Sequence, residues 1–134
     1  MKVAFATQDL ARVDAHFGWA RHLMVYDLTI EGATFVETFS FGGELQEDGN
    51  EDKLAPKVEA IKDCAVLYVA AIGGSAAARI VVNKIHPVKL KEPELILDVL
   101  EKMRVVLSGT PPPWLRKALL KGQARPFDFD EEAA

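Results

Sequence analysis

The chain has a single cysteine, Cys64, among its 134 residues. One cysteine cannot form an internal disulfide, and it cannot supply the several thiolates that a zinc finger or a cysteine-ligated iron–sulfur cluster requires. The sequence therefore predicts a protein of a reducing compartment, and we expect it to be cytoplasmic.

Basic residues and long apolar runs are also scarce. The 16 lysines and arginines are outnumbered by 20 acidic residues, which gives a formal net charge of −4, whereas nucleic-acid binding usually requires a basic face. No apolar run reaches the length of a membrane span, and the N-terminus lacks the basic start and the cleavage site of a signal peptide. We expect neither a nucleic-acid partner nor a membrane partner.

The apolar segments that are present predict an α/β protein with one main domain. The predicted strands span residues 1–7, 22–28, 34–41, 64–71 and 86–90, and the predicted helices begin near Asp52, after a cap at Ser75, and at Pro93. Strands two and three flank a turn at Gly32 and read as an antiparallel hairpin, whereas strands separated by helices should be parallel. The order βββαβαβα predicts a mixed five-stranded sheet flanked by helices.

A proline-rich stretch, "SGTPPP", marks a boundary in this pattern. We predict an α/β domain over residues 1–107 and a C-terminal extension over residues 108–134. The extension combines the proline-rich link, a short amphipathic helix ending at Gly122, and an acidic tail, "FDFDEEAA".

The predicted topology sorts the polar residues between the two edges of the sheet. The loop after the first strand, the acidic loop over residues 42–52 and the loop at Gly73 should share the edge where the parallel strands end. Ligands of open α/β sheets bind beyond this edge. Cys64 and His86 begin strands and should lie at the opposite edge.

His16, in the motif His-Phe-Gly of the first of these loops, is the leading candidate metal ligand. A loop histidine beside Gly18 has the exposure that coordination needs, and neutral imidazole suits iron. An ordinary packed turn is the alternative for His16. His22 is a second candidate, although it more readily points along a strand face.

Further candidates surround these histidines. Phe17 is a cofactor contact or, more often for an aromatic ring, an anchor of the loop. Arg21 could add positive potential. Gly73, Gly74 and Ser75 precede a helix whose exposed N–H groups favour an anion, or they merely permit a tight turn.

Signals for catalysis are missing. There is no Gly-x-Ser-x-Gly elbow and no cysteine–histidine pair at one edge. A two-metal nuclease needs carboxylates held close together, and the strands "VAFAT" and "AVLYVAA" carry none. We therefore expect a protein that is not an enzyme.

Three segments resemble the dinitrogenase iron–molybdenum cofactor biosynthesis family, which includes NifX, NifY and NafY. The segments are "VDAHFGWARHLMVYDL", "DGNEDKLAPKVEAIKDCAVLYVAAIGGSAAARIV" and "HPVKLKEPELILDVLEKM". The likeness covers residues 1 to about 107, and "PPPWLRKAL" resembles the C-terminal addition of NifX members. The start of the chain directly at the first strand favours the NifX branch.

The resemblance implies a ribonuclease-H-like fold and a carrier without catalytic activity. It implies binding of NifB-co, the iron–sulfur–carbide precursor of the nitrogenase cofactor, and of related intermediates on their way from NifB to the NifEN scaffold. The family's proposed cofactor ligand is the histidine of the His-Phe-Gly motif, which is His16 here.

Two other functions remain open from the residues alone. A regulatory or phosphate-ligand binding module would use the Gly73–Ser75 helix start, and a pure interaction protein would dock its Trp114 helix on a partner.

Overall fold

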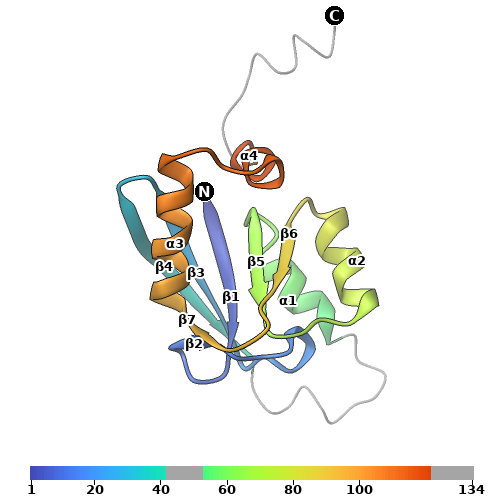
Figure 1. Cartoon of the computed structure of the whole chain (residues 1–134). Helices are drawn as coiled ribbons and strands as arrows, with labels where there is room; N and C mark the ends of the chain where they lie inside the picture. The colour runs from blue at the N-terminus through green and yellow to red at the C-terminus, as the bar shows by residue number, and fades with distance from the viewer. Residues whose placement is uncertain (42–52, 122–134) are drawn as a thin grey trace, which may run out of the picture.

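A five-stranded sheet lies at the centre of the computed structural model, which describes residues 1–41 and 53–121. The acidic loop over residues 42–52 and the tail beyond residue 121 fall outside the described residues. The strands are β1 (Lys2–Thr7), β3 (His22–Thr29), β4 (Gly32–Ser40), β5 (Val66–Val69) and β6 (His86–Lys89). Their order across the sheet is β4-β3-β1-β5-β6 (Figure 1).

The strand directions confirm the predicted fold class. β1 and β3 pair antiparallel, as do β3 and β4 in the hairpin, whereas β1, β5 and β6 are parallel to one another. The crossovers between the parallel strands contain α1 (Leu54–Ala60) and α2 (Gly74–Val82). The result is the predicted ribonuclease-H-like mixed sheet flanked by helices.

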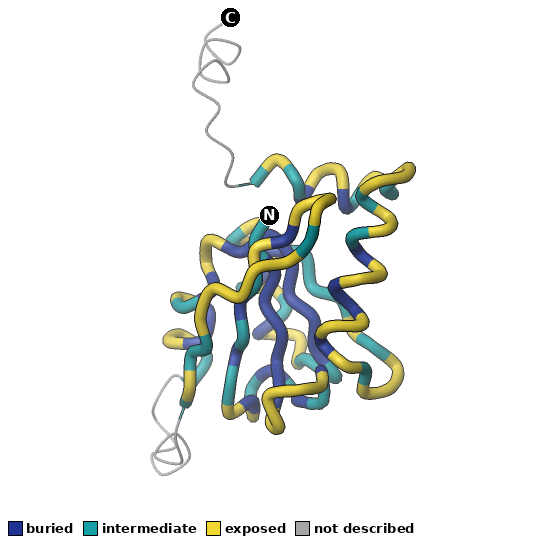
Figure 2. Tube along the Cα trace, turned by 90° about the vertical axis from the view of Figure 1, so that its left-hand side faces the viewer, coloured by how far each residue is buried: buried dark blue, intermediate teal, exposed yellow. Residues whose placement is uncertain are grey.

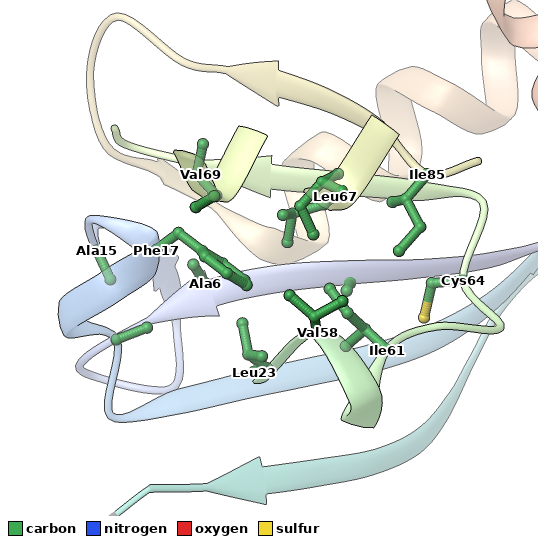
Figure 3. Packing of buried hydrophobic residues seen from close by; sticks show 14 of the residues in the cluster. Ala6, Ala15, Phe17, Leu23, Val58, Ile61, Cys64, Leu67, Val69 and Ile85 are labelled. Atoms are coloured by element: carbon green, nitrogen blue, oxygen red, sulfur yellow. The ribbon is translucent and has the colours of Figure 1, made fainter. Parts of the chain in front are cut away.

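Helices cover both faces of the sheet because the central strands are apolar on both sides. Along β1, Ala4 and Ala6 face the core cluster that includes Val58 of α1 and Ile80 of α2. Figure 3 shows Ala6 and Val58 within this cluster. The intervening β1 residues face a second cluster, built with α3 (Ile96–Ser108) and α4 (Pro113–Leu119). Figure 2 shows the central strands buried between outer segments that are largely exposed.

Two predicted helix starts are wrong. α2 begins at Gly74 with the extended Gly73 as its N-cap, so Ser75 lies inside the first turn and does not cap the helix. α3 begins at Ile96 and not at Pro93, because β7 (Glu94–Leu95) first pairs with β2 (Arg12–Val13) in a small antiparallel sheet. α1 does begin close to the predicted position, with Pro56 in its first turn.

α4, in the predicted C-terminal extension, packs on the end of the sheet opposite the His-Phe-Gly loop. Leu115 and Ala118 are buried in the second core cluster. The Trp114 ring stacks on the His86 imidazole, with ring centroids 4.3 Å apart and an interplanar angle of 14°.

The division of the chain at residue 107 stays a prediction. In the described part of the chain, no helix is both long enough and apolar enough to cross a membrane.

Candidate functional site

The His-Phe-Gly motif forms a tight turn that is fastened to the end of β5. His16 forms a parallel bridge with Ala71, just beyond β5. The Phe17 N–H donates to the Ala71 carbonyl at 2.8 Å, and the Ala70 N–H donates to the Ala15 carbonyl at 2.9 Å. Residues Phe17–Trp19 then form a single 3₁₀ turn, η1. The turn is thus held at the edge where the parallel strands end, as the topology predicts.

The His16 imidazole is half-buried and caps this turn. Its Nδ1 accepts a hydrogen bond from the Gly18 N–H at 3.0 Å. A Cβ at residue 18 would lie 3.4 Å from both Nδ1 and Cε1 of His16, so glycine leaves room for the ring. Since Nδ1 acts as the acceptor, a neutral His16 carries its proton on Nε2.

The two aromatic residues of the turn have different surroundings. The Phe17 side chain is completely buried in the first core cluster and anchors the turn. A ring without exposed surface favours the interpretation of Phe17 as an anchor of the loop. Trp19 is 64% exposed, and the Lys53 Nζ lies 5.2 Å from the centroid of its ring.

His22 and Arg21 lie at the same edge of the sheet. His22 pairs with Thr7 at the end of β1, and its Nδ1 is 2.9 Å from the Ser40 Oγ on β4. The Arg21 side chain is exposed, while its backbone N–H donates to Gln8 Oε1 at 2.8 Å. The strand pairing thus gathers the two predicted residues beside the turn, and it gives the His22 ring a hydroxyl partner.

Gly73, Gly74 and Ser75 follow the anchoring residue Ala71 closely in the chain. All three residues are exposed at the N-terminus of α2, and a Cβ added at either glycine would meet no atom within 4 Å. The structure therefore places this helix start at the edge of the sheet that carries His16. Neither glycine has a positive φ or a close neighbour, so neither position requires glycine for the turn.

A buried lysine, Lys57, lies directly behind the turn and is not among the residues predicted from the sequence. Its Nζ donates to the carbonyl oxygens of Gly18 at 2.9 Å and Phe17 at 3.2 Å. Burial, together with the nearby charge of Lys53, lowers the pKa of Lys57 to about 8. One signal could have revealed it: Lys57 shares the apolar face of α1 with Val58 and Ile61, where a charged side chain is out of place.

The opposite edge of the sheet holds the residues predicted there. Cys64 is fully buried, and burial raises the pKa of its thiol to about 12, so the thiolate that binds metals is disfavoured. Burial also lowers the pKa of His86, beneath Trp114. Across residues 1–41 and 53–121, no three histidine, cysteine or acidic side chains gather as metal ligands would.

The family model for the dinitrogenase iron–molybdenum cofactor matches residues 1–105 of the chain. Protein NifX of Herbaspirillum seropedicae is 66% identical over 132 residues, which cover 98% of this chain and 90% of that protein. A segment of the FeMo cofactor biosynthesis protein NifB of Bradyrhizobium diazoefficiens is 36% identical over 87 residues, covering 64% of this chain and 17% of NifB. The crystal structure of PH0822 shares the fold, with a TM-score of 0.60 and 23% identity over 78% of this chain and 91% of that one.

Proposed function

The chain belongs to the dinitrogenase iron–molybdenum cofactor family, and from this premise we propose that it is a carrier in the biosynthesis of that cofactor for nitrogen fixation. Its cargo would be NifB-co or a related iron–sulfur precursor, bound transiently and passed on unchanged. The protein would act without catalysis, in the cytoplasm, between NifB and the NifEN scaffold. The similarity of a NifB segment to this chain supports a place next to NifB in the order of cofactor transfer.

The observation that carries the proposal is the position of His16. Its half-buried imidazole lies on a turn that is hydrogen-bonded to the end of β5. That edge is where open α/β sheets bind their ligands. Imidazole is a good ligand for iron, and the exposed helix start at Gly74 adds N–H donors for the sulfides of an anionic cluster.

The tautomer of His16 favours Nδ1 as the ligating atom. If iron bound Nε2 while Nδ1 kept its hydrogen bond to Gly18, the neutral ring would have to lose its last proton. Ligation by Nδ1 exchanges the Gly18 N–H for iron, and the proton stays on Nε2. The released Gly18 N–H is then free to donate to a sulfide of the cargo.

Such a site suits a carrier because it holds its cargo weakly. Thiolates would bind iron strongly, but the chain's single thiol is buried at the opposite edge. One imidazole that must first give up a capping hydrogen bond leaves the cluster exchangeable. A cargo held in this way can move on to a scaffold that offers more ligands.

Anaerobic gel filtration of the full chain with NifB-co tests the proposal. We expect a coloured protein peak that contains iron, and we expect His16→Asn to elute nearly free of iron. Asparagine is the matched variant because its side chain also caps a turn, so the fold is retained while the imidazole is lost.

A wild-type chain that elutes colourless beside free NifB-co would refute the carrier function. A thermal shift with nucleotides or inorganic phosphate, in a chain that binds no cluster, would point instead to the phosphate-ligand module at Gly73–Ser75. An unchanged iron content in His16→Asn would keep a carrier but move the site elsewhere.

A further inference from the structure

Lys57 is a buried cation to which the carrier function described above has not yet assigned a role. Its side chain has no exposed surface, although lysine is almost never fully buried unless it is paired. Its hydrogen bonds run to two backbone carbonyls, those of Phe17 and Gly18. Its Nζ also lies 5.4 Å from the centroid of the Phe41 ring. Both carbonyls belong to the turn that carries His16, so within residues 1–41 and 53–121 the two hydrogen bonds of Nζ are directed at that turn.

One of these carbonyls connects Lys57 to His16 through a single peptide group. The Phe17 carbonyl and the Gly18 N–H belong to the same peptide. The Lys57 Nζ donates to the oxygen of this peptide, and the N–H of the same peptide donates to the His16 Nδ1. A cationic donor on the oxygen polarises the peptide and strengthens its N–H as a donor, because linked hydrogen bonds polarise one another. The buried ammonium is thus two hydrogen bonds away from the imidazole.

The second carbonyl makes this link rigid. Lys57 also holds the Gly18 carbonyl, at 2.9 Å, so the peptides on both sides of Gly18 are fixed by one side chain. The fixed Gly18 N–H determines which ring nitrogen of His16 is the acceptor, and therefore which tautomer a neutral ring adopts.

We propose that Lys57 is a positioning residue of the cluster site, which orients His16 through the Phe17–Gly18 peptide and places a positive charge behind the anionic cargo. This inference rests on the proposed carrier function. In the empty protein, Lys57 strengthens the hydrogen bond that holds the His16 ring. In the loaded protein, it orients the released Gly18 N–H toward the cargo and offsets part of the negative charge of the cluster.

NMR of the empty protein at neutral pH tests the positioning role without any cluster. In the wild type, we expect the His16 proton on Nε2, an N–N coupling across the hydrogen bond between Gly18 and Nδ1, and slow exchange of the Gly18 amide. The Lys57 ammonium protons should also exchange slowly. In Lys57→Met, the His16 ring should become a mixture of tautomers, and the Gly18 amide should exchange at least about tenfold faster.

Lys62→Met is the matched control. Lys62 follows α1, is exposed and pairs with Glu59 at its surface, so its loss changes the net charge equally without touching the turn. The NMR signals of Gly18 and His16 in Lys62→Met should equal those of the wild type. Should Lys57→Met fail to fold, the wild-type spectra still decide: rapidly exchanging Lys57 ammonium protons and no coupling between Gly18 and His16 would overturn the proposal.

Loading with NifB-co tests the electrostatic part. We expect Lys57→Met to bind about tenfold more weakly than both the wild type and Lys62→Met. Equal binding by all three chains would overturn the role of Lys57 and leave the carrier function intact. A wild type that binds no cluster would refute the carrier function, while the spectra of the empty protein would still decide whether Lys57 orients His16.

Discussion

The Nδ1 of His16 accepts a hydrogen bond from the amide of Gly18, two residues further along the chain and 3.0 Å away. This contact makes His16 a structural cap as well as a candidate ligand, and the two roles predict different mutational effects. His16→Ala should lower the free energy of unfolding by about 1 kcal/mol, the usual cost of losing an N-cap. His16→Asn should cost less, because its amide oxygen replaces the acceptor. Denaturant titration of both variants measures the difference, and equal losses would show that the cap contributes nothing.

Gly18→Ala tests how closely the His16 ring approaches the backbone. The new Cβ would lie 3.4 Å from two ring atoms, at the short limit of ordinary van der Waals contact, so it narrows the space for the ring beside the Gly18 N–H. We expect iron retention after anaerobic gel filtration to fall several-fold, with a small loss of thermal stability. Ser108→Ala is the control, because this exposed residue lies at the end of α3, away from the turn. Similar iron losses in the two variants would argue against a specific role for the His16–Gly18 contact.

Cys64→Ala should separate stability from binding. Cys64 is buried far from His16, so removing its sulfur should cost roughly 1 kcal/mol, as the deletion of one heavy atom from a packed core does. The iron bound from NifB-co should not change. In the folded wild type, thiol reagents should react very slowly, since burial raises the pKa of Cys64 to about 12. Loss of iron from Cys64→Ala would mean that the site lies at the other edge.

Lys57 should give the chain a distinctive dependence of stability on pH. Its folded pKa, about 8, lies below the value of 10.5 expected in the unfolded chain. Between these two values the unfolded state binds the extra proton, so raising the pH favours the folded state. Relative to Lys57→Met, the wild type should therefore gain stability from about pH 8 to about pH 10.5, at up to roughly 1.4 kcal/mol per pH unit. Taking the difference between the two chains cancels the titrations that they share, and a flat difference would contradict a buried Lys57.

Trp114→Ala tests the packing of α4 at the opposite edge. The variant should lose about 2 kcal/mol of stability, because a large ring leaves the His86 imidazole and the second core cluster. Solvent then reaches His86, so the pKa of its imidazole, which burial lowers, should rise toward its ordinary value. An NMR titration measures the pKa. Cluster loading should be unaffected, and a lost cluster with an intact fold would mean that the α4 end of the sheet takes part in cluster binding.

Much of this fold follows from local patterns in the sequence. The five main strands are long enough for their apolar runs to be recognised, and helices between strands force parallel crossovers. The two-residue strands at Arg12–Val13 and Glu94–Leu95 could not be predicted, because they have no periodicity and depend on a partner some 80 residues away. Their pairing also explains why Pro93 does not begin α3.

The positions of the candidate site residues at one edge of the sheet were predictable, and the contacts between them were not. Chain topology alone places His16 and Gly73 at one edge. The capping of Gly18 by His16 depends on side-chain geometry. The burial of Lys57 depends on α1 packing behind a turn that lies 39 residues earlier in the chain. In the sequence, the burial of Lys57 is indicated only by its position as a charged residue on the apolar face of a helix.

The most direct test of His16 as the ligand is NMR of the full chain labelled with ¹⁵N-histidine, recorded anaerobically before and after loading with NifB-co. The chain has only three histidines, and His86 is stacked beneath Trp114 at the far edge. We predict that the ring nitrogens of His16 shift strongly or broaden beyond detection on loading, whereas those of His86 do not change. Loaded protein in which the His16 signals stay where they were in the empty protein would contradict the account.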